Sequence, residues 1–170
     1  MRKIDISTKT HPAVFTLVDD ADFDWLNQYN WCMHRDHNVQ YALTNTPRDR
    51  HGKQKTIRMH RLIMGLGHKD GLMIDHINRD GLDNRRCNLR MCTFSQNGMN
   101  KRTTTGSSKY KGVCWHKRDK SWTACIRLRK ELIYLGYHDS EIDAAKTYDN
   151  KAIELFGEFA NLNFPEVPCA

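Results

Sequence analysis

The stretch that decides the fold lies in the middle of the chain, where residues 74–97 read IDHINRDGLDNRRCNLRMCTFSQN. Apolar and polar residues alternate around 74–77 and around 88–92, and a loop rich in Gly, Asp, Asn and Arg separates the two segments. This pattern predicts the two strands of a hairpin. Thr93 and Gln96 follow at the spacing of a capping box, so a short helix should begin there and run to Asn100. The predicted unit is strand, loop, strand and helix.

Four polar residues of this unit have the chemistry that phosphodiester hydrolysis requires. That reaction needs a base to activate water and a cation to stabilise the charge that develops on the phosphate and the leaving 3′ oxygen. His76 can supply the base, and Asp75 and Asn97 can hold the cation. We expect Asn88 to brace the hairpin backbone rather than to bind metal. An Asp-His pair alone is commonly structural, so the prediction depends on the whole spacing.

The expected cation is Mg²⁺, with Mn²⁺ as the alternative ion. Amide and carboxylate oxygens suit a hard ion that keeps most of its waters and also accepts phosphate oxygens. Since the set contains a single carboxylate, from Asp75, we predict a one-metal mechanism.

The cysteines indicate neither a disulfide framework nor a zinc knuckle. Six cysteines are present, and no two of them form a C-x-x-C pair, so no zinc is expected. Cys87 and Cys92 are interpreted as small buried thiols, and the alternative is a Zn²⁺ site that borrows His60 or His68.

The chain before this unit, residues 12–58, predicts a small sheet and a short helix. An apolar run at 13–18 indicates a strand, and the acidic residues that follow it favour the start of a helix through Trp25 and Leu26. Three more short strands are predicted, at 31–33, 39–43 and 56–59. This block shows no catalytic pattern, and its acids are interpreted as capping and solvated residues.

The chain after this unit predicts a linker and a second small domain. Residues 101–108 contain no apolar side chain and indicate a connection between domains. Strands are predicted at 110–115, 122–128 and 132–137, followed by a helix that ends at Gly157. The predicted packed side of this helix consists of Ile142, Ala145, Tyr148, Ala152 and Phe156. Three strands and one helix form a minimal two-layer domain.

Charge is distributed unevenly along the 170 residues, which carry a net charge of +7. Residues 101–130 contain ten basic residues and one acid, whereas residues 131–170 contain eight acids and two basic residues. The basic stretch is either a solvated face or a surface for a polyanion. Tyr110, Trp115 and Trp122 lie within it and favour a nucleic-acid surface.

The chain contains no run of about 18 apolar residues of the kind that crosses a bilayer. Its first residues do not form the apolar core of a signal peptide either. We therefore expect a soluble intracellular protein without a membrane partner.

The central motifs resemble the HNH endonucleases of phage and intron homing type, which contain a ββα-metal (His-Me) finger. The resemblance rests on residues 59–63, 74–78, 82–90 and 95–97. It implies that His76 is the general base, that Asp75 and Asn97 are the metal ligands, and that Asn88 holds the hairpin in place. It also implies products with 5′-phosphate and 3′-hydroxyl ends. Family members often have zinc-binding cysteine pairs around the finger, and without them the finger should be braced by packing against the first block.

Several basic residues near the finger have open interpretations. We expect His60 and Arg61 to pack and brace it, while Arg61, Arg85 and Arg86 have the reach to contact phosphates. Lys101 and Arg102 of the linker are expected to contact DNA as well.

The C-terminal block resembles an AP2 DNA-binding domain, on the motifs at 110–113, 122–127, 135–137, 144–149 and 161–165. In that fold a three-stranded sheet lies in the major groove of DNA. The resemblance matches Lys111 and Arg127 to contacting basic residues and Trp122 to a contacting Trp, with a core position as the alternative for Trp122. Strand position and charge add further candidates, which are Trp115, His116, Lys117, Arg118 and Arg129. Cys125 stands where plant members commonly have Glu, so their sequence preference does not transfer.

Together these patterns predict an α+β protein. A small N-terminal sheet region and the finger occupy residues 1–100, with the finger core at about 60–100, a basic linker follows at 101–108, and an AP2-like domain follows at 109–170. The predicted function is a monomeric, Mg²⁺-dependent homing-type endonuclease that nicks double-stranded DNA at a specific site. If it is phage-encoded, it would act in the cytoplasm of a bacterial host. The alternative is a DNA-binding regulator with a catalytically idle finger.

Overall fold

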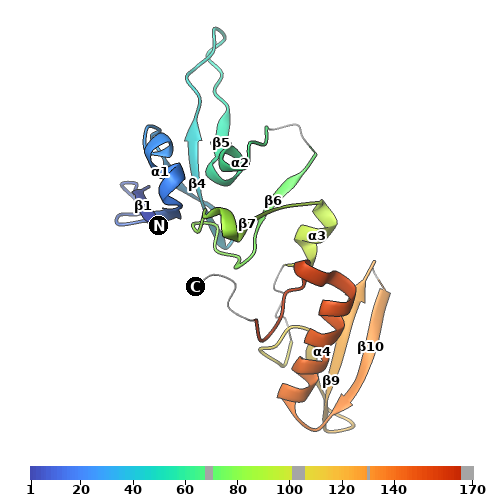
Figure 1. Cartoon of the computed structure of the whole chain (residues 1–170). Coiled ribbons are helices and arrows are strands. Elements are labelled where there is room, and N and C mark those ends of the chain that lie inside the picture. The colour runs from blue at the N-terminus through green and yellow to red at the C-terminus, as the bar shows by residue number, and fades with distance from the viewer. Residues whose placement is uncertain (68–70, 101–105, 130, 166–170) are drawn as a thin grey trace. The chain divides into compact units, whose positions relative to one another are not determined.

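The computed structural model describes residues 1–67, 71–100, 106–129 and 131–165 (Figure 1). Within these residues the chain is a mixed α+β protein with small antiparallel sheets and few helices, which confirms the predicted class. The described residues form two compact units, one within 1–94 and one within 95–165. No helix in the described part of the chain combines the length and the apolar character needed to span a bilayer.

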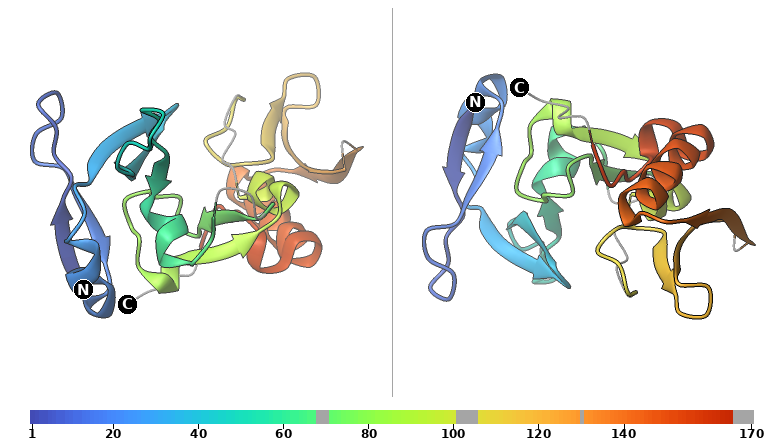
Figure 2. Two further views of the ribbon diagram at one scale, coloured as in Figure 1. Left: turned by 90° about the horizontal axis from the view of Figure 1, so that it is seen from above. Right: turned by 90° about the horizontal axis from the view of Figure 1, so that it is seen from below.

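The first unit opens with a hairpin. β1 (Arg2–Asp5) pairs antiparallel with β2 (Phe15–Val18), and the two strands lie side by side in Figure 2. α1 (Asp20–Leu26) follows directly, so the predicted strand and helix are both present. β1 has no counterpart among the predicted strands, because Ile4 is the only apolar residue of its four.

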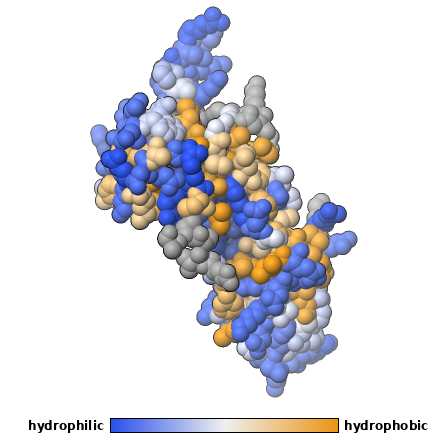
Figure 3. All heavy atoms as spheres, in the orientation of Figure 1, coloured by the Kyte–Doolittle hydropathy of each residue, from blue (hydrophilic) through white to orange (hydrophobic). Residues whose placement is uncertain are grey.

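A second sheet of the first unit has the order β3-β4-β5, with strands Cys32–Asp36, Val39–Asn45 and Thr56–Arg58. These strands confirm the predicted small sheet. The hairpin between β4 and β5 extends outward (Figure 1), and hydrophilic residues cover its visible face in Figure 3. Met59 was expected to end the last strand, but it begins a short helix, α2 (Met59–Ile63), and its side chain is fully buried.

The next segment has the predicted order of strand, loop, strand and helix. β6 (Met73–His76) pairs antiparallel with β7 (Leu89–Cys92), and α3 (Phe94–Met99) follows. Asn88 was expected in the second strand, but it ends a 3₁₀ turn, η1 (Arg86–Asn88), just before β7. Cys87 lies in this turn and is exposed, so its prediction as a buried thiol is wrong, while Cys92 is buried as predicted.

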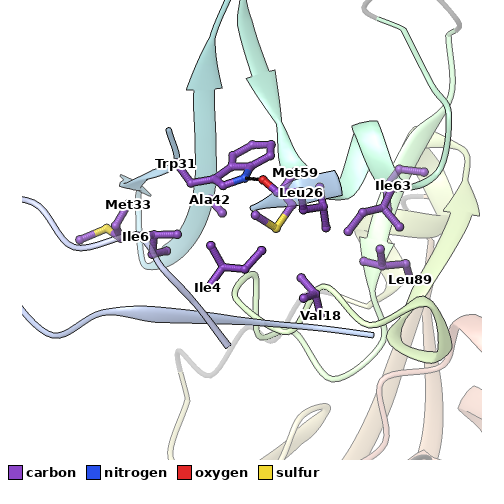
Figure 4. Packing of buried hydrophobic residues seen from close by; sticks show 11 residues of the cluster. Ile4, Ile6, Val18, Leu26, Trp31, Met33, Ala42, Met59, Ile63 and Leu89 are labelled. Atoms are coloured by element: carbon purple, nitrogen blue, oxygen red, sulfur yellow. Dashed lines mark hydrogen bonds between the residues drawn. The ribbon is translucent and has the colours of Figure 1, made fainter. Parts of the chain in front are cut away.

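One hydrophobic core joins the N-terminal sheets to this hairpin (Figure 4). The Trp31 indole also donates a hydrogen bond to the main-chain oxygen of Leu26, at 2.8 Å. Ile74 of β6 and Leu89 of β7 belong to the same core, which confirms that the hairpin is braced by the first block. The buried members are Ile4, Ile6, Val18, Leu26, Trp31, Met33, Ala42, Met59, Ile63, Ile74 and Leu89.

The second unit consists of a three-stranded antiparallel sheet with one long helix against it (Figure 1). The strands are β8 (Val113–His116), β9 (Ser121–Leu128) and β10 (Glu131–His138), in the order β10-β9-β8. α4 (Glu141–Phe156) and the 3₁₀ turn η2 (Gly157–Phe159) follow. The interface between sheet and helix consists of Val113, Ala124, Ile126, Ala144, Ala145, Tyr148 and Ala152. The predicted strands and helix are therefore present.

Two details of the second unit differ from the prediction. Ile142 was expected on the packed side of α4, but it is 47% exposed because it lies about 200° around the helix from Ala144. The first strand begins at Val113 rather than residue 110, because Gly112 has a φ of 75° and breaks the extended backbone. A Cβ at Gly112 would lie 2.0 Å from a ring carbon of Tyr148, so the backbone approaches the helix where only glycine fits.

Candidate active site and nucleic-acid interface

The imidazole of His76 is buried at the end of β6. Its Nε2 lies 3.3 Å from Oδ1 of Asn84, and its ring centroid lies 5.0 Å from that of His60 and 6.0 Å from that of Tyr41. Burial lowers the pKa of His76, although nearby carboxylates oppose the shift. The ring is therefore neutral near pH 7 and has a lone pair that can accept a proton.

Tyr41 and His60 form an aromatic wall beside His76. The rings of His60 and His76 meet edge to face, and the Tyr41 centroid lies 5.6 Å from that of His60. Burial lowers the pKa of His60 to about 2, with smaller contributions from the charges of a protonated His76, Arg58 and Arg61. His60 is therefore a neutral packing residue, in agreement with its expected bracing role. The backbone of Gly81 packs directly against the Tyr41 ring, where a Cβ would lie only 2.9 Å from a ring carbon.

Asp75 is paired with an arginine on the neighbouring strand. Asp75 and Arg90 stand opposite each other in the register of β6 and β7. Nε and Nη2 of Arg90 donate to Oδ2 of Asp75 at 3.0 and 2.7 Å, and both side chains are at most 10% exposed. This buried pair fixes the position of the Asp75 carboxylate next to His76 in the chain.

Asn88 braces the loop between the two strands. Its Nδ2 donates to Oδ1 of Asn78 and to the main-chain oxygen of Asp83, at 2.9 and 2.8 Å. Its Oδ1 accepts from the main-chain N–H of Asn78 at 2.9 Å. Because these bonds occupy both ends of the amide, Asn88 braces the loop. The residue opposite His76 in the register of the hairpin is Leu89.

Arg85 and Arg86, which were expected to contact DNA, are each bound to a carboxylate. Arg85 forms a two-point pair with Asp83 at 2.8 and 2.7 Å. Arg86 forms a similar pair with Asp22 of α1 at 2.7 and 2.8 Å, and the Arg86 side chain is 53% exposed. The expected capping role for the acids of α1 is wrong at Asp22, which is 3% exposed and bridges to the loop. Arg86 lowers the pKa of Asp22 through these hydrogen bonds.

Arg61 of α2 also has a bracing role. Its guanidinium donates to the main-chain oxygens of Gly67 and Leu72, and the latter bond measures 2.9 Å. These bonds tie α2 to the segment that leads into β6.

The two expected metal ligands belong to different units of the chain. Asp75 lies in the first unit, and Asn97 of α3 lies in the second. Among the residues that the structure describes, no three His, Cys, Asp or Glu side chains cluster closely enough to hold an ion.

The sheet face opposite α4 carries exposed aromatic and basic side chains. Tyr134 and Tyr137 of β10 are 54% and 51% exposed, with ring centroids 5.4 Å apart, and His116 lies 5.6 Å from Tyr137. Arg127 of β9 is exposed and lies on this face, because strand residues alternate and its neighbour Ile126 points toward α4. Three further candidates, Lys117, Arg118 and Arg129, are exposed in the turns at the strand ends.

Lys111 and the two tryptophans have structural partners. Nζ of Lys111 donates to the main-chain oxygen of Met99 at 2.8 Å, at the C-terminal end of α3, where a positive charge is favourable. Trp122 packs against the hydrophobic cluster between the sheet and α4. This supports the alternative interpretation of Trp122 as a core residue. Trp115 stands opposite Trp122 in the sheet, and their centroids are 5.1 Å apart. This placement does not support contact of Trp122 with DNA through the opposite sheet face.

Lys101 and Arg102 lie outside the described residues. Ser107 and Ser108, at the other end of the predicted linker, are bonded within the second unit. Ser107 accepts from the Trp115 N–H at 2.7 Å, and Ser108 donates to Glu141 at 2.7 Å.

Sequence reasoning missed four residues around His76 and Asp75. Arg90 had a usable signal, because the register of the predicted hairpin places opposite charges at Asp75 and Arg90 across the strands. The other three are Tyr41, Asn84 and Thr16, whose hydroxyl oxygen lies 2.7 Å from Nδ2 of Asn84. They are distant in the sequence or lie in polar stretches, and no local pattern marks them.

Comparison with known proteins gives matches for both parts of the chain. The family model described as HNH endonuclease matches residues 59–99. "Uncharacterized HNH endonuclease L560" of Acanthamoeba polyphaga mimivirus is 30% identical over 153 residues, which cover 89% of this chain and 75% of that protein.

Plant transcription factors are similar over a shorter part of the chain. "APETALA2-like protein 2" of Oryza sativa subsp. indica is 46% identical over 61 residues, which are 35% of this chain and 14% of that protein. "Ethylene-responsive transcription factor ERF018" of Arabidopsis thaliana is 44% identical over 70 residues, which are 40% of this chain and 35% of that protein. The chain thus spans only a minor part of these plant proteins. Because the match to the viral relative extends over most of both proteins, the chain belongs to the HNH endonuclease family.

Proposed function

We propose that this protein is a homing-type endonuclease that nicks double-stranded DNA at a specific site. The observation that carries the proposal is the position of His76 within the segment that matches the family. Its ring is buried between His60, Tyr41 and Asn84 and is kept neutral there. A neutral imidazole held in one orientation has the properties of a general base.

The proposed reaction is the hydrolysis of one phosphodiester bond. His76 takes a proton from the attacking water, the new P–O bond forms, and the bond to the 3′ oxygen breaks as that oxygen takes a proton from a second water molecule. This leaves a 5′-phosphate and a 3′-hydroxyl. Asn88 contributes by bracing the loop that follows His76. One such site in a monomer cuts one strand in each binding event.

The proposed cofactor is Mg²⁺, with Mn²⁺ as the alternative, and the proposed ligands are Asp75 and Asn97. The donor chemistry fits, since Mg²⁺ commonly takes one or two protein oxygens and completes its shell with waters and phosphate oxygens. When bound, the ion would stabilise negative charge on the phosphate and the leaving oxygen. Arg90 supports this role because its two hydrogen bonds to Oδ2 hold the Asp75 carboxylate in one position.

We further propose that β6, β7 and α3 form the ββα-metal finger and that the second unit is an AP2-like reader of duplex DNA. The reading face would be the sheet face opposite α4, with Arg127 directed at the DNA and Lys117, Arg118 and Arg129 at its edges. The alternation of β9 and the exposure of these side chains support this assignment. Groove contacts from strands of this kind combine hydrogen bonds to base edges with phosphate contacts.

Cleavage by wild type and His76→Ala tests the proposal. Each protein is incubated with end-labelled duplex DNA that contains the sequence flanking the gene, with Mg²⁺, and the products are resolved on a denaturing gel. The wild type should produce one cut on one strand, and His76→Ala should bind equally and cut at least about 100-fold more slowly. His11→Ala, which changes an exposed histidine of the same unit, is the control and should cut like the wild type.

The gel also separates this function from its alternative. A regulator with an idle finger would bind DNA, and neither protein would cut. Cutting by His76→Ala at the wild-type rate would exclude His76 as the base.

A further inference from the structure

Three buried side chains of the first unit form a directed chain of hydrogen bonds that ends at His76. Oγ1 of Thr16, in β2, lies 2.7 Å from the main-chain oxygen of Leu82 and 2.7 Å from Nδ2 of Asn84. Oδ1 of Asn84 lies 3.3 Å from Nε2 of His76. Thr16 and Asn84 are both fully buried, at 0% exposure.

The chemistry of these groups determines the direction of every bond. A main-chain oxygen can only accept, so the single hydroxyl proton of Thr16 points to Leu82. Toward Asn84 the hydroxyl can then only accept, so the atom facing it must be the NH₂ group of Asn84. The main-chain oxygen of Gly81, 3.5 Å from the same nitrogen, requires the same orientation. The amide oxygen of Asn84 therefore faces the histidine.

The last bond of the chain determines the tautomer of the histidine. An amide oxygen cannot donate, so Nε2 of His76 must carry the proton that Asn84 accepts. A neutral imidazole has one N–H, which leaves the lone pair on Nδ1. We infer that Thr16 and Asn84 are positioning residues that hold His76 in the Nε2–H tautomer, so that Nδ1 is the atom that accepts the proton of the attacking water. This inference rests on the proposed role of His76 as the base.

The backbone around these side chains makes the arrangement rigid. The main-chain N–H of Leu17 donates to Leu82, and that of Asn84 donates to Leu17, each at 2.8 Å. β2 and the loop after His76 are thereby joined by main-chain hydrogen bonds. Because Thr16 and Asn84 have no surface exposed to solvent, bulk water cannot replace the hydrogen bond that Asn84 donates to Thr16 if the hydroxyl is removed.

The direct test is the tautomer of His76 in the full-length protein, measured by long-range ¹H–¹⁵N NMR correlation of the histidine rings near pH 7.5. His76→Gln identifies the signals that belong to this residue. The wild type should show the pattern of a ring protonated at Nε2. Thr16→Val keeps the volume of the side chain but removes the hydroxyl, so only the longer bond to Gly81, at 3.5 Å, still orients the Asn84 amide. Part of the amide population should then turn over, and part of the His76 population should shift to the Nδ1–H form. A wild-type ring protonated at Nδ1 would overturn the inference without any variant.

Cleavage provides the second readout. Thr16→Val should cut about 10- to 100-fold more slowly in single-turnover assays with Mg²⁺, at unchanged affinity for DNA. Thr16→Ser restores the hydroxyl and should restore both the rate and the tautomer. Thr44→Val is the matched control, because Thr44 is also buried and donates its hydroxyl to a main-chain oxygen, that of Asn30, at 2.8 Å. It should behave like the wild type.

The outcomes separate this inference from the proposed function. An unchanged tautomer and rate in Thr16→Val would overturn the positioning role, and so would equal losses in Thr16→Val and Thr44→Val. If the wild type does not cut DNA but its His76 is protonated at Nε2 and shifts in Thr16→Val, the positioning role is supported and the nuclease function is contradicted.

Discussion

The bridge between α1 and the loop before β7 should contribute a measurable part of the stability of the first unit. Asp22 accepts two hydrogen bonds from Arg86 and a third from the Trp25 indole, at 3.1 Å. In Asp22→Asn the shape is kept, but the charge is lost and an NH₂ group competes with the donors of Arg86. Hydrogen bonds to a charged group contribute about 1.5–3 kcal/mol each. Since the Arg86 side chain is 53% exposed, solvent screens the pair, and we expect a loss of about 2 kcal/mol for the whole bridge.

This loss should appear in the first unit and not in the second. A loss of that size corresponds to a fall in melting temperature of about 8–16 °C for a unit of fewer than 100 residues. Urea unfolding of the full-length protein, monitored by hydrogen exchange of peptides from each unit, measures the stability of the two units separately. Asp24→Asn is the control, because Asp24 lies on the same helix with its side chain 86% exposed and pairs with Arg2 at the surface, so it should show little change.

The pH dependence provides a further check on the same bridge. Arg86 depresses the pKa of Asp22 below its ordinary value of 3.8. A carboxyl with a depressed pKa in the folded state contributes stability that is present above the unfolded pKa and lost as the pH falls through the folded pKa. The difference between wild type and Asp22→Asn should thus be constant near neutral pH and shrink below about pH 4. A difference that does not change with pH, or an equal loss in Asp24→Asn, would refute the electrostatic explanation.

Two predictions concern the second unit. Gly112→Ala should destabilise it by about 3 kcal/mol, because a positive φ and a clash with Tyr148 combine. The control Gly52→Ala, at a φ of 73° with open space around it, should destabilise the first unit by only about 1 kcal/mol. Hydrogen exchange measures both losses, and equal losses would contradict the packing argument. Arg127→Met should weaken DNA binding and reduce the slope of log K against log salt concentration by about one. The control Lys146→Met, on the exposed side of α4, should leave that slope unchanged. Fluorescence anisotropy over a salt series measures both slopes. Equal slopes for Arg127→Met and the wild type would remove Arg127 from the phosphate contacts.

Local patterns were sufficient to predict most elements of this fold. The hairpin β6–β7 and α3 were predictable because alternation, a polar loop and a capping sequence agree over one short stretch. β1 and α2 were not, because four residues with one apolar side chain and a five-residue helix fall below the length at which periodicity is informative.

The alternation of β9 also contained information about the tryptophans. Trp122 shares its parity with Ala124 and Ile126, which are almost fully buried against α4, whereas Arg127 has the opposite parity. Strand parity therefore separates the side chains that face the helix from those that face away, and charge or aromatic character alone does not. A sheet packed on one helix has one covered face and one open face, so the parity of each residue in β9 could have been used to assign it to a face from the sequence alone.

The pairs around the candidate site show why its motif is an incomplete description of it. Arg86 is bound by Asp22, 64 residues earlier, and Asn84 is oriented by Thr16, 68 residues earlier. Neither partner lies within residues 59–99, the segment that identifies the family. Pairs so far apart leave no local pattern in a single sequence, because each partner is placed by the packing of other elements.

The first block of the chain, which has no catalytic pattern, therefore shapes the surroundings of His76. Tyr41 of β4 walls the His76 ring, Thr16 of β2 orients the amide that holds it, and Ile4 of β1 packs in the core that Ile74 and Leu89 share. A hairpin and a short helix bury too little apolar surface to fix an imidazole on their own. The family motif can be short because the other elements of the first unit supply the burial, the hydrogen-bond direction and the ion pairs that hold its side chains in one orientation.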